Sequence, residues 1–287
     1  MNAAAQLRGL LQPGAPIVRA PGAYDSLSAR LVEQAGFPAI YMTGFGATAS
    51  RLGLPDIGLL TQTEMTEHAR NMVRATQAPI IADADTGYGG PSNIHRTVQE
   101  YIQAGVAAIH LEDQVAPKRC GQMAGIQLMS RAESEKRLKA ALSARDDDDL
   151  IVIARTDALA ATGREDAIDR AKSYQDAGAD LVFVDGIKTR ADIEYVAHHL
   201  PGRKVASLVD GTDAASLTAG ELQEMGFSMV FYALTALFAA VTGARTTLAR
   251  LHDGEVIPAS TSGINYTDYS QIVGLDFHQR LDAAYGA

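Results

Sequence analysis

Short apolar runs bounded by Gly, Pro, Asp or Ser recur along the whole chain. They occupy residues 16–25, 37–44, 79–85, 107–113, 150–157, 181–186, 204–210 and 228–233. Runs of this length between turn-forming residues are typical of buried strands. Most are followed by stretches such as 26–36 and 93–105, in which Ala, Leu, Ile or Val returns every three or four residues. The pattern therefore predicts strands that alternate with amphipathic helices.

This order predicts a (β/α)₈ barrel of the TIM type. No GxGxxG motif follows the first strand, so a doubly wound dinucleotide-binding sheet is disfavoured. Four glycines, at 36, 105, 178 and 226, stand between a helix and the next strand, where a left-handed helix cap is expected. We expect one domain over residues 1–287, in which 239–287 form a C-terminal helical extension that completes the barrel wall or packs on another subunit.

Composition and charge narrow the class of protein. The formal net charge is -9, which disfavours nucleic acid and anionic membranes as partners. The chain contains one cysteine, no apolar stretch of membrane-spanning length and no signal-like amino terminus, so we expect a cytoplasmic protein that acts on small molecules.

Charged residues gather where the predicted strands end. Asp83 and Asp85 close the third strand, Glu112 the fourth, Arg155 the fifth and Asp185 the sixth. Reactive groups of such barrels lie at these carboxyl ends, because the loops there form the mouth. The sequence thus predicts a site at the mouth.

The acidic residues indicate a metal site. Asp83 and Asp85 would share one face of a regular strand, and Glu112 on the next strand can point into the same space. Converging carboxylates repel one another unless a hard divalent cation lies between them, and oxygen ligands favour Mg²⁺, with Mn²⁺ as a substitute. The alternative is that "DTGYGG" at 85–90 is only a turn.

Four longer segments carry a resemblance. "YMTGFGATASRLGLPDIGLLT", "ADADTGYGG", "IHLEDQVAPKRCG" and "IARTDALAATG" occur in this order. Over about residues 15–240 the chain resembles the isocitrate lyase and phosphoenolpyruvate mutase superfamily. The likeness is strongest to its small bacterial methylisocitrate lyases, dimethylmalate lyases and carboxyvinyl-carboxyphosphonate phosphorylmutases.

The resemblance implies a Mg²⁺-dependent enzyme, usually a homotetramer built as a dimer of dimers with terminal helices swapped between subunits. Asp83 would bind the metal directly, while Asp56, Asp85 and Glu112 would hold its waters. A substrate carboxylate would bind to Arg155 and to the backbone N–H groups of the segment Thr43, Gly44 and Phe45.

The segment "KRCG" corresponds to the loop that closes over the substrate in the lyases of this family. There the cysteine, here Cys120, protonates the fragment left when a carbon–carbon bond breaks. We expect Lys118 and Arg119 to lower the pKa of this thiol, Gly121 to let the loop swing, and Tyr41 to act as the base. It is also possible to interpret Cys120 as an ordinary small apolar residue and Tyr41 as a packing residue.

Four positions depart from the family pattern around the substrate: Gln122 replaces a histidine, Asp185 a glutamate, Ser207 stands in a segment that usually carries asparagine, and Phe45 replaces a glycine. Gln122 cannot become a cation. Because the metal-site acids remain, we expect the reaction to be retained and its specificity to be altered.

The leading hypothesis is a lyase that cleaves a 2-hydroxy dicarboxylate, or an alkyl-substituted malate- or isocitrate-like acid, to a 2-oxo acid and a carboxylate. Competing hypotheses are a mutase or hydrolase of phosphonate P–C bonds, an oxaloacetate decarboxylase, and a non-catalytic barrel that binds a small acid. The loop cysteine disfavours the phosphonate enzymes.

Overall fold

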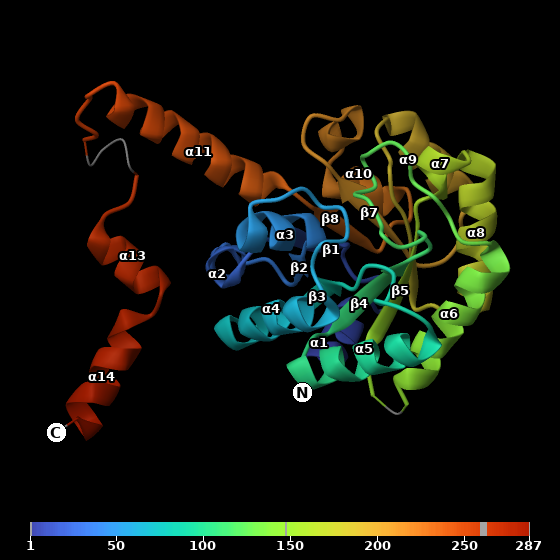
Figure 1. The fold of residues 1–287 in the computed structure, drawn as a ribbon, viewed down its shortest axis with the longest axis horizontal. Helices are drawn as coiled ribbons and strands as arrows, with labels where there is room; N and C mark the ends of the chain where they lie inside the picture. The colour runs from blue at the N-terminus through green and yellow to red at the C-terminus, as the bar shows by residue number, and fades with distance from the viewer. Residues whose placement is uncertain (1, 147, 259–262, 287) are drawn as a thin grey trace. The chain divides into compact units, whose positions relative to one another are not determined.

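The computed structural model describes residues 2–146, 148–258 and 263–286. Its parallel strands form a closed barrel in sequence order, in which β8 pairs with β1, and this confirms the predicted architecture (Figure 1). The strands are β1 (Val18–Ala23), β2 (Ile40–Met42), β3 (Ile80–Asp83), β4 (Ala108–Glu112), β5 (Ile151–Thr156), β6 (Leu181–Val184), β7 (Lys204–Leu208) and β8 (Met229–Tyr232).

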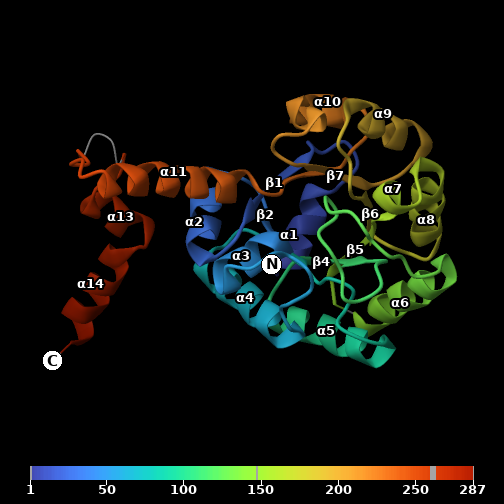
Figure 2. The same ribbon diagram turned by 45° about the horizontal axis from the view of Figure 1, so that its top comes forward.

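Helices surround the barrel, as Figure 2 shows from a second direction. They are α1 (Ala3–Leu10), α2 (Ser26–Gln34), α3 (Gly44–Leu52), α4 (Gln62–Ala75), α5 (Pro91–Ala104), α6 (Arg131–Ala144), α7 (Ala158–Ala161), α8 (Arg164–Asp176), α9 (Arg190–His199) and α10 (Ala219–Glu224), together with the 3₁₀ turn η1 (Asp213–Ser216).

Local sequence signals fix many of the helix ends. Thr61 and Glu64 form a capping box, which satisfies two amide groups at the start of α4. At the other end of a helix, Gly105 adopts φ 86°, and the other three predicted cap glycines also have positive φ. The helix–glycine–strand repeat expected from the sequence is therefore confirmed.

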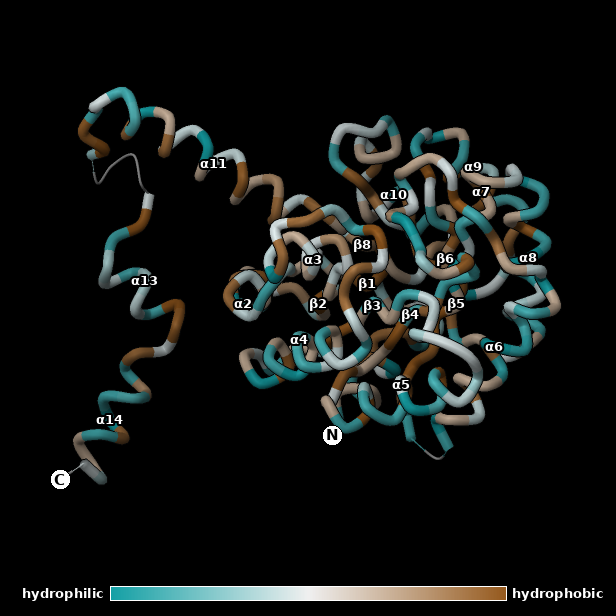
Figure 3. Tube along the Cα trace, viewed as in Figure 1, coloured by the Kyte–Doolittle hydropathy of each residue, from teal (hydrophilic) through white to brown (hydrophobic). Residues whose placement is uncertain are grey.

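Two apolar layers hold the barrel together. One lies between the sheet and the helices, and the other fills the lumen with side chains such as Ile81, Ile153 and Phe231. In Figure 3 the strands are coloured mainly hydrophobic, while the helices around them alternate. Leu7 of α1 joins the lumen cluster and Arg8 pairs with Asp180, so α1 covers the amino-terminal end. The carboxyl-terminal end is left for the site.

The chain divides into two compact units, residues 1–235 and 236–287. The second contains most of α11 (Thr235–His252), with α13 (Tyr266–Ile272) and α14 (Leu275–Tyr285), and neither α13 nor α14 has a buried residue. The predicted extension 239–287 falls in this unit, although 259–262 and 287 lie outside the described residues. The assignment of 1–287 to one domain stays a prediction. Within the described ranges, no helix is both long enough and apolar enough to span a bilayer.

Candidate active site at the carboxyl end of the barrel

A cavity opens at the carboxyl ends of the strands. Most of the predicted site residues line it: Tyr41, Thr43, Phe45, Asp56, Asp83, Cys120, Gly121, Gln122, Arg155, Asp185 and Ser207. Phe183, Val209, Ala233 and Leu234 complete the lining. Three predicted residues do not line it but contact the site. Gly44 contacts Asp83, Asp85 contacts Lys118 and Glu112 contacts Arg155.

The alternation of the strands explains why polar groups meet there. Ile81, Ile153 and Phe183 point into the lumen, so the residues two positions later also point inward, one layer nearer the mouth. Those residues are Asp83, Arg155 and Asp185. A charged layer thus lies on top of an apolar one.

Asp83 is almost fully buried and accepts hydrogen bonds from the backbone N–H groups of Gly44 (3.2 Å) and Asp85 (2.9 Å). Burial by itself would raise the pKa of this carboxyl, but His110, Lys118 and other nearby positive charges lower the pKa to about 2. Asp83 is therefore ionised at neutral pH.

Asp85 does not continue the strand. β3 ends at Asp83, and Asp85 has φ 45°, so the expectation that both side chains share one face of a regular strand is wrong. Burial, together with the charges of Asp83 and Asp56, raises the pKa of Asp85 to about 6, even though Lys118 opposes this shift.

Lys118 bridges two of the predicted metal-site acids. Its ammonium is 2.6 Å from Asp56 Oδ1 and 2.8 Å from Asp85 Oδ1, and its side chain is 4% exposed. From the sequence, Lys118 was considered only as a positive charge near Cys120, and its pairing with the acids was missed. The one signal that could have placed it in the site was its position two residues before Cys120.

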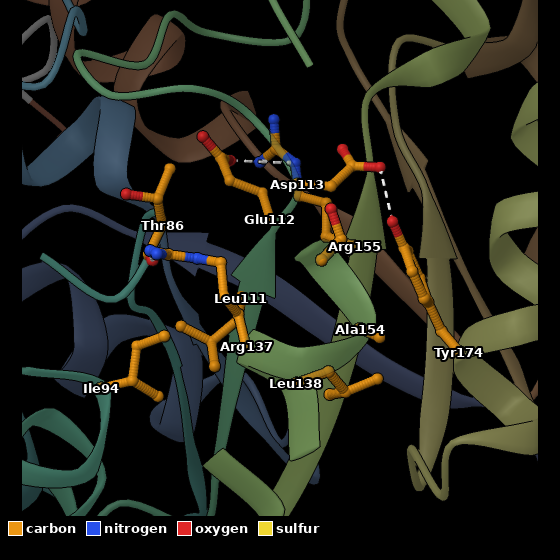
Figure 4. A pocket seen from close by; sticks show the side chains of 11 residues that line it. Thr86, Ile94, Leu111, Glu112, Asp113, Arg137, Leu138, Ala154, Arg155 and Tyr174 are labelled. Atoms are coloured by element: carbon orange, nitrogen blue, oxygen red, sulfur yellow. Dashed lines mark hydrogen bonds and ion pairs between the residues drawn. The ribbon is translucent and has the colours of Figure 1, made fainter. Parts of the chain in front are cut away.

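Arg155 is surrounded by carboxylates. Its guanidinium donates to both oxygens of Asp157 (3.0 and 2.8 Å), lies 2.7 Å from Asp185 Oδ2 and approaches Glu112 Oε2 at 3.2 Å. Figure 4 shows Glu112 and Arg155 facing each other. Burial raises the pKa of Glu112 well above its usual value, although the charge of Arg155 lowers it.

One buried carboxylate oxygen of the described residues, Glu112 Oε1, has neither a hydrogen bond nor an ion pair. Glu112 Oε2 and Asp85 Oδ1 have no hydrogen bond and only the ion pairs with Arg155 and Lys118. Buried carboxylate oxygens need a hydrogen bond, a proton or a cation. No three Asp, Glu, His or Cys side chains of the described ranges are arranged to hold an ion by themselves. Mg²⁺ uses one or two carboxylates and keeps several waters, so this donor set fits it.

Asp113 follows Glu112 but belongs to the opposite face of the sheet. It accepts hydrogen bonds from Thr156 Oγ1 (2.7 Å), the Asp157 N–H (3.0 Å), Tyr174 Oη (2.9 Å) and Arg170 Nη1 (3.2 Å). It lines a second cavity beside β4 and β5, which Arg155 also lines, and its bond to Tyr174 is drawn in Figure 4. Asp113 therefore holds the segment from which Asp157 clamps Arg155.

The loop that carries Cys120 lies over the mouth. The Cys120 N–H donates to Asp56 O (3.1 Å), and the Gln114 side chain binds both the N–H and the carbonyl of Arg119. At Gly121 the backbone is so close to the charged layer that an added Cβ would lie 2.7 Å from Asp157 Oδ1. Position 121 therefore requires glycine, because a Cβ there would collide with the charged side chains below the loop.

The expectation that the pKa of the Cys120 thiol is lowered is wrong. Burial, with help from Asp185 and Asp56, raises its pKa to about 11, although the Gln122 N–H and Arg155 lower it. Lys118 turns to the acidic residues and Arg119 is exposed. The thiol consequently keeps its proton at neutral pH, as a proton donor must.

Tyr41 is poorly suited to the role of base. Its hydroxyl lies 3.0 Å from His110 Nε2 and its ring stacks on Phe231. Burial, reinforced by the charge of Asp83, raises its pKa well above 10. His110 lies two residues before Glu112 on the same inward face. Its ring packs near Phe183 and Phe231 in the lumen, and its Nδ1 approaches Asp83 Oδ1 at 3.8 Å.

The amino terminus of α3 provides the remaining predicted contacts. Thr43 caps the helix by accepting from the Gly46 N–H (3.4 Å), and Phe45 is partly buried. The Gly44 N–H is already bound to Asp83. The assignment of this segment to a substrate carboxylate stays a prediction, as does that of Ser207, which is buried on β7.

Comparisons with known proteins agree with this geometry. Residues 7–252 match the family model described as phosphoenolpyruvate phosphomutase. The chain is 38% identical to 2,3-dimethylmalate lyase of Eubacterium barkeri, over 99% of both chains. It is similar to the structure of oxaloacetate acetylhydrolase with 3,3-difluorooxalacetate (TM-score 0.93, 37% identity, 100% and 98% of the two chains). It is also similar to phosphonopyruvate hydrolase with oxalate and Mg²⁺ (TM-score 0.88, 32% identity, 99% of each chain).

Proposed function

The chain belongs to the phosphoenolpyruvate mutase and isocitrate lyase superfamily, and from this premise we propose that it is a Mg²⁺-dependent carbon–carbon lyase. Its substrate would be a 2-hydroxy dicarboxylate or an alkyl-substituted malate- or isocitrate-like acid, and its products a 2-oxo acid and a carboxylate. The observation that carries the proposal is the position of the Cys120 thiol in the same cavity as Asp83 and Arg155.

Asp83 would bind the metal directly, and Asp56, Asp85 and Glu112 would hold its waters. Mn²⁺ is the expected substitute, because it also takes oxygen ligands. When bound, the ion would supply Lewis-acid polarisation of the substrate hydroxyl. Lys118 neutralises part of the surrounding negative charge from the Asp56 and Asp85 side.

Arg155 would bind a substrate carboxylate, because its guanidinium is held rigidly by Asp157 and Asp185. Gly121 and Gln122 would contribute donors from the loop, and the segment 43–45 and Ser207 would contact the remaining groups. The high pKa of Tyr41 leaves the base unassigned among these residues.

Cys120 would give its proton to the carbon that loses its bond partner. The pKa of about 11 keeps the proton on sulfur until that carbon becomes basic. The Gln122 N–H and the charge of Arg155, which both lower this pKa, would then stabilise the thiolate that remains. Loop closure would keep water from protonating the carbon in its place.

Phosphonate P–C bond cleavage or rearrangement is the second candidate, since both a family match and a solved structure of similar fold carry such names. Oxaloacetate decarboxylation is a third candidate, and binding of a small acid without catalysis is a fourth. Decarboxylation of oxaloacetate and hydrolysis of a P–C bond also leave an enolate carbon that needs a proton, so Cys120 does not separate these reactions from the lyase. We favour the lyase because the chain is 38% identical to 2,3-dimethylmalate lyase over 99% of both chains.

One panel of assays tests these functions. Purified protein with Mg²⁺ is incubated with 2,3-dimethylmalate, citramalate, methylisocitrate, oxaloacetate or phosphonopyruvate, and 2-oxo acid, CO₂ and phosphate are followed. We expect 2-oxo acid from a hydroxy acid, loss of activity with EDTA, and a large loss in Cys120→Ala but not in Asp210→Asn, an exposed acid outside the cavity. Undiminished cleavage in Cys120→Ala would refute the proton-donor role, and phosphate release would establish a phosphonate-cleaving enzyme.

We also propose that the chain assembles as a homotetramer, a dimer of dimers with swapped carboxyl-terminal helices. Large apolar side chains in the second unit are exposed, among them Leu248 (64%), Val256 (85%), Phe277 (55%) and Tyr285 (83%). Apolar surface of this kind is typical of an interface. Light scattering of the whole protein and of a chain ending at residue 235 tests this: we expect a tetramer that is lost on truncation, and a monomeric full-length protein would contradict it.

A further inference from the structure

The lining of the mouth cavity changes character around the barrel. The arc formed by β3 to β6 carries Asp83, Arg155 and Asp185. The arc formed by β7 and β8 is uncharged at the same level, where the lining consists of Ser207, Val209, Ala233 and Leu234. Because the strands close in sequence order, β7 and β8 lie across the cavity from β3 and β4.

The uncharged arc is continuous with the lumen core. Ala233 and Leu234 belong to the apolar cluster that fills the lumen, and Val209 packs against it. This wall therefore directly follows two strands of the barrel. Its oxygen-bearing member, Ser207, is neutral.

Cations are scarce in this cavity. Among its lining residues, which all lie in the described part of the chain, Arg155 is the only cationic side chain. Three carboxylates already surround it. Lys118 is not part of the lining and is already paired with Asp56 and Asp85. A substrate carboxylate placed against the uncharged arc would thus be desolvated with no cation to pair with, which is costly.

We infer that the uncharged arc selects substrates whose substituent at this end is hydrogen or a short alkyl group, and that Val209 and Leu234 are the residues that determine this specificity. The inference rests on the proposed function, which orients the substrate with its metal-binding carboxyl and hydroxyl groups toward β3 to β6. It assigns the natural substrate to the alkyl-substituted malates and excludes tricarboxylic acids of the isocitrate type.

Binding of acids that cannot be cleaved tests the arc without catalysis. Calorimetry in the presence of Mg²⁺ compares the affinity for methylsuccinate with that for propane-1,2,3-tricarboxylate. The first acid carries an apolar methyl substituent, and the second carries a charged carboxymethyl substituent at the same position. We expect methylsuccinate to bind at least about tenfold more tightly, in the range that one alkyl contact gives in an apolar pocket. Equal binding, or tighter binding of the tricarboxylate, would overturn the inference.

Variants at the wall make the test specific. Val209→Thr keeps the shape of the side chain and removes its apolar character, and Leu234→Ala opens the wall; both should reduce the preference for the alkyl acid about tenfold. Val209→Arg should reverse it, by supplying the missing cation. Val256→Thr, in the exposed part of the chain, is the matched control and should leave the ratio unchanged. Thermal melts check that each variant folds.

The cleavage panel separates the two proposals. If 2-oxo acid forms from methylisocitrate as efficiently as from dimethylmalate, the lyase stands and the specificity inference fails. If no acid is cleaved but the binding preference and its reversal in Val209→Arg persist, the inference stands and the lyase fails.

Discussion

The pH dependence of Cys120 alkylation tests the electrostatics of the site most directly. The chain contains one cysteine, so the incorporation of iodoacetamide that is lost in Cys120→Ala reports on this thiol alone. Burial, followed by the charges of Asp185 and Asp56, raises its pKa from 9.0 to about 11. A shift of two units lowers the thiolate fraction at pH 8 about 100-fold, since only the thiolate reacts.

The rate falls less than the thiolate fraction does. A thiolate of higher pKa is the better nucleophile, and this returns roughly a factor of 10 for a shift of two units. We therefore expect alkylation at pH 8 to be about tenfold slower than in the urea-unfolded chain, before any loss of access. The sharper signature is the profile, which should still rise about tenfold per pH unit at pH 10 and level off near 11.

The assay uses metal-free protein in EDTA, with mass spectrometry of the intact chain at each time point. Asp185→Asn should move the midpoint to lower pH, because the charge of Asp185 raises the thiol pKa. Asp210→Asn is the matched control, since this acid is exposed and binds Thr235. A midpoint at or below pH 9 in the folded wild type would refute the reasoning, and with it the view that Cys120 stays protonated at neutral pH.

Three further perturbations probe the same framework. Gly121→Ala should cost about 100-fold in kcat/KM without lowering the melting temperature, because the new methyl group pushes the loop off the charged layer; wild-type kinetics would contradict this. Asp113→Ala should lower the free energy of unfolding in urea by about 3–5 kcal/mol, because it leaves the buried donors of Thr156, Asp157 and Tyr174 without their acceptor and removes one of the two carboxylates that pair with Arg170, whereas Glu194→Ala, from an exposed pair, should change little. Finally, folding raises the pKa of Asp85 from 3.8 to about 6. Protonated Asp85 therefore stabilises the metal-free fold at pH values below 3.8, and this stabilisation is lost as the pH rises through 6. Mg²⁺ needs the carboxylate, so the gain in melting temperature on adding Mg²⁺ should grow between pH 5 and 7; a gain independent of pH would contradict the assignment.

The sequence alone determined the barrel and the position of its site. Strand and helix periods are local properties, and eight alternations of them leave few architectures. Strand alternation also settled that Asp83, Glu112 and Arg155 would lie together, because parallel strands bring their carboxyl ends to one rim. The glycines at helix ends belong to the same local logic. The close approach of the loop at Gly121 does not, because it depends on Asp157 and Arg155, and the sequence predicted only that this glycine lets the loop swing.

Only the tertiary structure decided the electrostatics. Lys118 could not be paired with Asp56 from the sequence, because 62 positions separate them, and the turn at Asp85 broke the strand that alternation would have continued. The thiol pKa was expected to fall because Lys118 and Arg119 are neighbours in the chain. It rises because folding removes Cys120 from water and directs both cations elsewhere. Charge interactions depend on distance and burial in space, and neither quantity is encoded by sequence separation.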